Sequence, residues 1–325
     1  MSEVQHEALD RAARDALRAP SIFNTQPWTW RIDGAALELS PDWSRQVRAA
    51  DSIGNELLLS CGAALHHARV SLAAGGWTVH VEEMRPGSQV LARVTLVDRA
   101  PADPAAVRLH EAIARRRTDR RPYTDEPVPA DVLAALVAAA QTEGVALHRV
   151  RYDQMPMLAI AVGVAGATEM AEPEYVSELI RWTNRPEWSH DGVPPATAVQ
   201  KVPRRVPVRE FAVAPQEGIP VAAGGDLGAA YLILHGPDAA DPRSWLRAGQ
   251  ALSAVLLTAV SHGLAVAPIT DVLEVAHPRE LVQSLLGGSA EPYAVIRCGY
   301  PVDHTELPEA PRRTAEEAIH SAPER

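Results

Sequence analysis

The sequence of 325 residues contains only two cysteines, Cys61 and Cys298, and a single lysine, Lys201. Two thiols are too few for a disulfide-stabilised scaffold. The chain also lacks an excess of positive charge, and its formal net charge of −10 argues against general binding to nucleic acid. Long polar tracts are missing and the hydrophobic content of 46% is ordinary for a globular protein, so intrinsic disorder is not expected.

Targeting signals are not evident in the sequence. The N-terminus, MSEVQHEALDRAARDAL, is too polar and charged for a secretory signal. Residues 154–168 are uncharged, but they fall short of the roughly 20 apolar residues that cross a bilayer. We therefore expect a cytoplasmic protein that binds neither membranes nor nucleic acid. At roughly 150 residues per domain, the chain is long enough for about two domains or one large domain.

Arginine, by contrast, is abundant, since it accounts for 30 of the 31 basic residues. A GC-rich genome is the simplest reason for this bias. Whatever its origin, an anionic ligand of this chain would be held by guanidinium groups, which pair with phosphate oxygens as bidentate forks.

The hydrophobic pattern predicts alternating helices and strands. Helices are expected at residues 5–18, 51–74, 105–117, 129–142, 154–170, 172–183, 242–261 and 278–286. Strands are expected at residues 77–82, 90–97, 145–150, 229–235, 264–267 and 292–299, with a hairpin at 28–40. Residues 185–225 are rich in proline and glycine, and the chain from Pro301 onward is expected to be extended.

Two segments share one pattern at an offset of 187 residues. Residues 61–79 and 248–266 each read as a long helix with small residues, followed by a glycine and a buried strand. A second pairing sets the helix around Leu9 against the helix around Leu133. These matches predict two copies of one α+β unit. The predicted division is a first half at 1–100 and a second half at 101–325, with an insertion at about 171–225.

Four segments carry side chains suited to a ligand. Residues 19–28, APSIFNTQPW, place four hydrogen-bonding side chains between two prolines. Residues 115–121, RRRTDRR, offer guanidinium forks and a hydroxyl that match the oxygens of a phosphate. The others are the pair Arg312-Arg313 and the strand end at residues 263–271. Taken singly, each also has an ordinary explanation: a capped loop, a solvated basic turn, a polar tail or a strand end.

Taken together, these segments resemble the FMN-dependent nitroreductase family. The resemblance is carried by APSIFNTQPW, RRRTDRR, GLAVAPIT and IRCGYP, the last followed by the arginine pair. In that family the site spans a dimer interface, with phosphate-binding arginines from one subunit and the Ser/Asn loop from the other. Here the first half keeps the loop and the second half keeps the arginines, whereas residues 140–150, AQTEGVALHRV, contain no such loop. This fused arrangement is similar to the Acg-like subfamily, in which an insertion covers the flavin as a lid.

The resemblance implies an α+β, nitroreductase-like fold. Two tandem α/β half-copies, with mixed or antiparallel central sheets flanked by helices, would form an intramolecular pseudo-dimer with one FMN site per chain. The residues implied to bind the cofactor are Arg116, Thr118, Arg120, Pro20, Ser21, Asn24, Gln26, Ile269, Thr270, Arg312 and Arg313. The pair Thr270-Asp271 departs from the family pattern, in which Glu-Gly or a similarly small pair is expected.

The implied activity is hydride transfer from NADH or NADPH to FMN and then to a nitroaromatic, quinone or similar acceptor, without a catalytic side chain. The alternative is an FMN-binding or sequestering protein whose lid keeps substrates out. Trp182, Trp188 and Arg185 would then either stack over the flavin or anchor the lid. No metal site is expected, because His66 and His67 are adjacent and should diverge around a helix. The expected partners are small molecules, and the chain is expected to be a monomer or a weak homo-oligomer.

Overall fold

The computed structural model describes residues 2–83, 88–194, 204–209, 211 and 225–321. One group of strands comprises β1 (Trp28–Asp33), β2 (Ala36–Pro41), β3 (Trp77–Glu83), β4 (Ala92–Arg99) and β9 (Ile319–Ser321). The other comprises β5 (Ala146–Arg149), β6 (Ala230–Gly236), β7 (Ala265–Ile269) and β8 (Glu291–Gly299). The helices are α1 (Glu3–Ala16), α2 (Asn55–Ala74), α3 (Pro104–Arg115), α4 (Ala130–Thr142), α5 (Met155–Ala171), α6 (Pro173–Thr183), α7 (Pro242–Ser261), α8 (Asp271–Glu274), α9 (Ala276–Leu285) and α10 (Ala315–Ala318).

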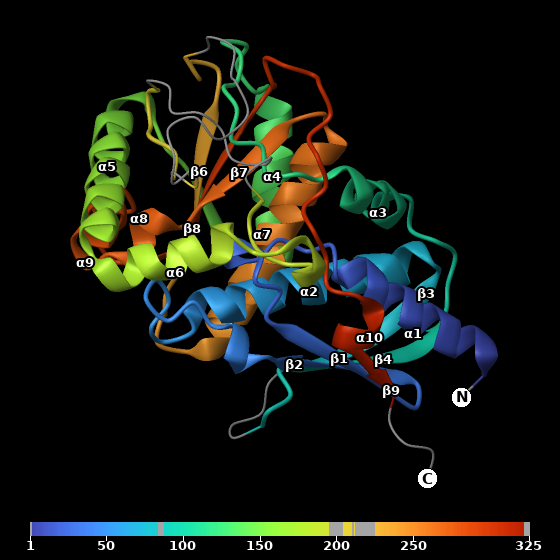
Figure 1. Ribbon diagram of the computed structural model, residues 1–325. Helices are drawn as coiled ribbons and strands as arrows, with labels where there is room; N and C mark the ends of the chain where they lie inside the picture. Colours follow the sequence, from blue (N-terminus) through green and yellow to red (C-terminus); the bar gives the residue numbers. More distant parts are fainter. Residues whose placement is uncertain (1, 84–87, 195–203, 210, 212–224, 322–325) are drawn as a thin grey trace.

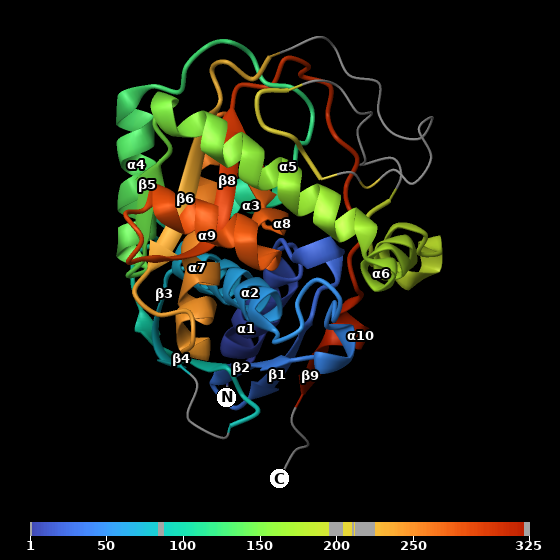
Figure 2. The ribbon, with the colours of Figure 1, turned by 90° about the vertical axis from the view of Figure 1, so that its left-hand side faces the viewer.

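The strands form two sheets that share one topology. The first sheet has the order β3-β4-β2-β1-β9 and the second has the order β5-β6-β8-β7. Apart from β9, each strand of one sheet therefore has a counterpart in the other, and all these pairings are antiparallel. Helices α2 and α7 lie between the sheets, and α5 and α9 cover the outer side of the second sheet (Figures 1 and 2). The repeated α+β unit expected from the sequence is thus visible in the strand order.

The central helices α2 and α7 are the clearest expression of the repeat. Each has 20 residues, and both their first and their last residues are 187 positions apart, from 55 to 242 and from 74 to 261. Helix α2 is long and apolar enough to cross a membrane by length and composition, but most of it is buried within the protein. Its side chains join those of α7 in one hydrophobic core with residues of both sheets.

Two glycines allow these helices to approach closely. A Cβ atom on Gly62 would lie 2.0 Å from the carbonyl oxygen of Leu246, and one on Gly249 would lie 2.0 Å from that of Leu59. The two contacts are related by the same offset of 187 residues, so the helices cross in a nearly two-fold symmetric way. Only glycine fits at these positions, because any side chain would overlap the opposite backbone.

Helix α2 begins later than its sequence suggests. It was expected at residues 51–74, but it starts at Asn55 after Gly54, whose φ of 85° is readily adopted by glycine. The Asp51 carboxylate still serves the helix, since it accepts a hydrogen bond of 2.9 Å from the backbone N–H of Leu57. Gly54 is therefore the N-cap, and the Asp51 side chain reaches the first turn of the helix from three residues earlier.

The C-terminal segment differs from the extended tail expected after Pro301. Residues 315–318 form the short helix α10, and β9 then pairs in parallel with β1, with Trp30 opposite Ile319. The end of the second half thus completes the sheet of the first half (Figure 1). A strand of three residues has no measurable alternation, which is why the sequence did not reveal it.

Candidate cofactor site

Two adjoining hollows lie where the first half of the chain meets the second. They share walls formed by Pro20, Ser21, Phe23, Thr118 and Arg120. The first, which we call the basic hollow, is also lined by Arg18, Asn24, Arg116, Arg117, Glu309 and Arg312. The second, the inner hollow, is also lined by Glu56, Arg209, Ile269, Thr270, Asp271 and Arg297. Their shared walls make them two ends of one elongated site.

The loop between α1 and β1 supplies one wall of both hollows. Phe23, Asn24 and Gln26 all have positive φ angles, of 45°, 54° and 51°. Residues other than glycine are strained at such backbone angles, and this strain is typical of segments held in place for function. Hydroxyl groups fix the loop, since Ser60 accepts from the backbone N–H of Ile22 at 3.2 Å and Ser21 accepts from that of Gln26 at 2.9 Å.

The arginine motif after α3 supplies the opposite wall. The backbone N–H of Asp119 donates to the carbonyl oxygen of Val266 at 2.8 Å, which joins the motif to β7. The preceding Arg116 is buried, and two of its nitrogens, Nε and Nη1, have no hydrogen-bond partner. Its Nη2 donates to the carbonyl oxygen of Arg18 at 3.3 Å. Burying guanidinium nitrogens without hydrogen-bond acceptors costs free energy, and a bound anion would supply the missing acceptors.

The basic hollow concentrates positive charge. Burial, together with neighbouring arginines, lowers the pKa of Arg116 to about 10 and that of Arg312 to about 9. The same causes lower the pKa of Arg120 to about 10. Arg312 is held in position by donating from Nη1 to the carbonyl oxygen of Ala19 and to Asn24 Oδ1, both at 2.9 Å. The negative charge of a bound phosphate would offset the repulsion among these cations.

Nine of the eleven residues implied by the resemblance line these hollows. They are Pro20, Ser21, Asn24, Arg116, Thr118, Arg120, Ile269, Thr270 and Arg312. Gln26 and Arg313 lie outside the lining and connect the loop to the C-terminal segment instead. The Arg313 N–H donates to Gln26 Oε1 at 2.8 Å, and its Nη1 donates to the carbonyl oxygen of Trp28 at 2.9 Å.

Several lining residues were missed at the sequence level. Arg18 and Arg117 both donate to Glu309 Oε1, at 2.8 and 2.7 Å, at the rim of the basic hollow. Glu56 and Arg209 line the inner hollow, although they lie far from every motif. The signal for Glu56 was available, because a carboxylate in the apolar helix stretch ELLLSCGAAL needs a special reason to be buried.

Parts of the insertion also line the site. Residues 192–194 line the basic hollow, while Val208, Arg209 and Phe211 line the inner one. The rest of the expected lid at 195–203, 210 and 212–224 lies outside the described residues. Trp182 is buried in a cluster with Phe23, Tyr175 and Phe211 and lines neither of these two hollows. Trp188 is 78% exposed.

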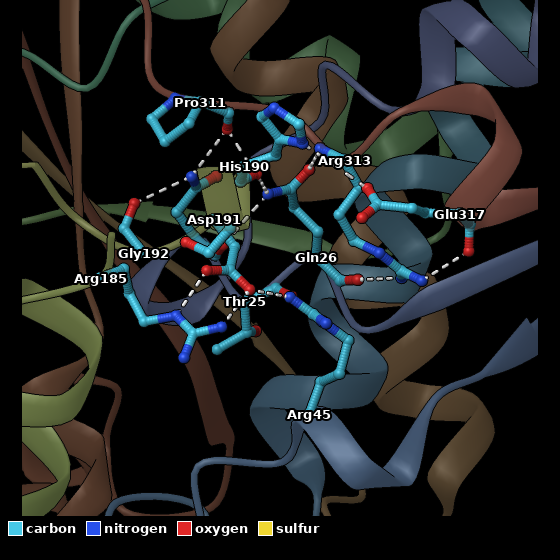
Figure 3. A network of polar contacts seen from close by, with 12 residues as sticks. Thr25, Gln26, Arg45, Arg185, His190, Asp191, Gly192, Pro311, Arg313 and Glu317 are labelled. Carbon is cyan, nitrogen blue, oxygen red and sulfur yellow. Dashed lines mark hydrogen bonds and ion pairs between the residues drawn. The ribbon is translucent and has the colours of Figure 1, made fainter. Parts of the chain in front are cut away.

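A polar network fastens residues 190–192 of the insertion to the loop (Figure 3). The N–H of Gly192 donates to the carbonyl oxygen of Asn24 at 3.2 Å, and Asn24 Nδ2 donates back to that of Gly192 at 2.9 Å. Asp191 lies between Arg45 and Arg185, and its Oδ1 accepts from Arg185 Nε at 2.6 Å. Burial opposes ionisation of Asp191, but its bonds to Arg185 and Ser189 and the nearby charge of Arg45 lower its pKa. The network therefore contains a stably charged carboxylate.

The two histidines of α2 differ from expectation. They were expected to diverge, yet Nδ1 of His66 lies 2.8 Å and Nδ1 of His67 lies 2.9 Å from the same hydroxyl, Ser253 Oγ on α7. Burial lowers the pKa of His66 to about 3, so its ring is neutral at physiological pH. Within the described ranges, no group of three His, Cys, Asp or Glu side chains is arranged to hold a metal ion. The pair instead contributes polar contacts between the central helices.

Comparisons with known proteins show which family the chain belongs to. Residues 113–300 match a family model described as "Nitroreductase family". Two Mycobacterium tuberculosis proteins (strain H37Rv) match nearly the whole chain. "Putative NAD(P)H nitroreductase Rv3131" is 38% identical over 94% of this chain and 88% of its own length. "Putative NAD(P)H nitroreductase acg" is 35% identical over 98% of this chain and 96% of its own.

Among solved structures, the "FMN and NADPH-dependent nitroreductase NfnB from sphigopyxis sp. strain HMH" is 20% identical, with a TM-score of 0.42. The similarity covers 65% of this chain and 97% of that one. The match to the family model and the two full-length relatives establish the relationship. The chain belongs to the nitroreductase family of oxidoreductases.

Proposed function

We propose that the chain is an FMN-dependent oxidoreductase that accepts hydride from NADH or NADPH and reduces a nitroaromatic, quinone or similar acceptor. The observation that carries this proposal is Arg116, a buried residue with two unpartnered nitrogens that lines a hollow rich in arginine. A phosphate monoester supplies the acceptor oxygens and negative charge that these groups lack. The names of the relatives support NADH or NADPH as the donor.

The proposed cofactor placement follows the chemistry of the two hollows. Arg116, Arg312 and Thr118 would bind the phosphate, with Ser21 and Asn24 along the ribityl chain. Pro20, Arg120 and the backbone of Ile269 and Thr270 would contact the flavin ring from the inner hollow. Bound FMN supplies the hydride chemistry, while the protein binds and orients it and controls access. Gln26 and Arg313 would act indirectly, by holding the loop in place.

We further propose that the chain is a pseudo-dimer with one complete site. In the first half, residues 17–27 connect α1 to β1 and include the whole loop. At the equivalent place in the second half, residues 143–145 suffice to connect α4 to β5. Three residues cannot form a loop like that of residues 20–26. A second flavin site would therefore lack one wall.

The second candidate function is FMN sequestration. It is favoured by the insertion residues Arg209 and Phe211, which line the inner hollow where an acceptor would have to approach. The Arg209 guanidinium lies 5.1 Å from the centre of the Phe23 ring, and the rings of Phe23 and Phe211 are 5.8 Å apart. The two rings meet edge to face, so Arg209, Phe23 and Phe211 pack together in the wall of the inner hollow.

Anaerobic titration with NADH and NADPH separates the two functions. If the chain is a reductase, the FMN-loaded protein loses its visible absorbance on addition of a nicotinamide donor and recovers it when a quinone is added. A yellow protein whose absorbance does not change would refute the reductase activity and favour sequestration. A colourless protein that takes up no added FMN would contradict both.

A further inference from the structure

Four buried carboxyl groups meet beside the inner hollow. They belong to Glu56 of α2, Glu169 of α5, and Asp271 and Glu274 of α8, and we call them the carboxyl cluster. Arg209 Nη2 donates to Glu274 Oε1 at 2.6 Å and to Glu169 Oε1 at 3.3 Å. Its Nε lies 3.7 Å from Asp271 Oδ2. One guanidinium group thus pairs with three of these four carboxyl groups.

The carboxyl cluster reaches two separate hollows. Glu56 and Asp271 line the inner hollow, whereas Glu169 and Glu274 line an outer hollow with Tyr175. The hydroxyl of Thr270, which lines the inner hollow, donates to Glu274 Oε1 at 3.2 Å. Groups that can exchange protons, the Glu274 carboxyl and the Thr270 hydroxyl, therefore connect the outer hollow to the inner hollow.

The charge of the cluster requires bound protons. Burial raises the pKa of Glu169 to about 9, and it also raises the pKa values of Glu56 and Asp271. The charges of Glu274 and Asp51 reinforce the rise in the pKa of Glu56, whereas those of Arg209 and Arg279 oppose it. Asp271 Oδ1, Glu274 Oε2 and the Tyr175 hydroxyl are buried without a hydrogen-bond partner. At neutral pH Glu169 therefore holds a proton, and burial favours the protonated forms of Glu56 and Asp271.

We propose that the carboxyl cluster is a proton relay, running from Glu169 through Glu274 and the Thr270 hydroxyl to an acceptor in the inner hollow. The proposal rests on the proposed reductase function. Reduction of a quinone by two electrons takes up one hydride and one proton. Bound FMN would supply the hydride for one O–H bond. For the other, the Thr270 hydroxyl would donate its proton to the acceptor and take a proton from Glu274 in exchange. The carboxylate left behind regains a proton from water in the outer hollow.

The relay also gives a role to Thr270 of the pair Thr270-Asp271, which departs from the family pattern, and Asp271 is a member of the carboxyl cluster. A Glu-Gly pair would offer no hydroxyl at position 270 and no carboxyl at 271. The simpler possibility is that the cluster only anchors Arg209 of the insertion. An anchor does not transfer protons, so a measurement of proton transfer separates the two roles.

The kinetic test uses Glu274→Gln, which keeps the size and an acceptor oxygen but cannot exchange a proton. The FMN-loaded protein is reduced with dithionite and mixed anaerobically with a quinone, in H2O and in D2O. We expect reoxidation to be about 100-fold slower than in the wild type, as for loss of a general acid. Glu172→Gln is the matched control, since Glu172 lines the outer hollow but is exposed. Equal rates and equal solvent isotope effects in both variants and the wild type would overturn the relay.

A second measurement needs no activity. The infrared spectrum of FMN-free protein at neutral pH should contain a protonated-carboxyl band that shifts in D2O and weakens in Glu169→Gln but not in Glu172→Gln. If the band is missing from the wild type, the relay is refuted. Because dithionite replaces the nicotinamide donor, failure of NADH and NADPH to reduce the protein would refute the proposed function without affecting either test.

Discussion

Arg116→Ala is expected to weaken FMN binding by about 100-fold, which corresponds to about 2.7 kcal/mol for a lost charge-assisted contact. The same substitution should raise the melting temperature of the FMN-free protein. Without the cofactor, Arg116 is a buried cation with two unpartnered nitrogens, and burial and neighbouring arginines lower its pKa to about 10. Removing a buried charge that lacks a partner relieves a cost of folding.

Arg115→Ala provides the matched control, because Arg115 is the adjacent residue of the same motif and is exposed. It should change neither FMN affinity nor melting temperature appreciably. Fluorescence titration with FMN and thermal unfolding of the FMN-free protein measure both effects. Equal FMN affinities of the two variants would show that Arg116 does not bind the cofactor. A lower melting temperature for Arg116→Ala would show that the Arg116 side chain stabilises the FMN-free protein.

Gly62→Ala is expected to destabilise the protein by about 3 kcal/mol or more, near the upper end for overpacking of a core. The new methyl group would lie 2.0 Å from the carbonyl oxygen of Leu246, so α2 and α7 would have to separate. Gly249→Ala should have a similar effect, because it meets the carbonyl oxygen of Leu59 at the same distance. The double variant should lose less free energy of unfolding than the two single variants lose together, because either substitution alone already forces the helices apart.

Gly163→Ala is the control for these glycine substitutions. Gly163 lies within α5, and a Cβ there would have no neighbour within 4 Å. Alanine should therefore stabilise the protein by about 0.5–1 kcal/mol through its better helix propensity. Urea unfolding of all variants gives the free energies. A stability of Gly62→Ala equal to that of Gly163→Ala would contradict the close helix crossing.

The sequence predicted the fold well where the elements are long and regular. Helix α7 occupies the expected residues, and the nitroreductase-like α+β fold is confirmed by the family match. The offset of 187 residues could be detected in the sequence because small residues at the helix crossing must recur in both halves. Strand β9 was missed because three residues carry no period, and its partner β1 lies almost three hundred positions earlier.

The candidate site was predictable only in part. The arginine motif and the Ser/Asn loop are contiguous in sequence, so both could be identified as candidates before their contact was known. Glu56 and Arg209 reach the inner hollow from α2 and from the insertion, and no local pattern connects them. Gln26 resembled its lining neighbours, but its side chain bonds to the C-terminal segment, where Oε1 accepts from the Arg313 N–H. Contacts made by tertiary packing alone leave little trace in a single sequence.

In the proposed arrangement, the two halves of one chain complete a single cofactor site. Its most direct measurement is the titration of FMN-free protein with FMN, with the bound fraction counted against the concentration of the 325-residue chain. Our account predicts saturation at one FMN per chain. Saturation at two would show that the short connection at residues 143–145 does not abolish the second site, and a chain that binds no FMN would contradict the account altogether.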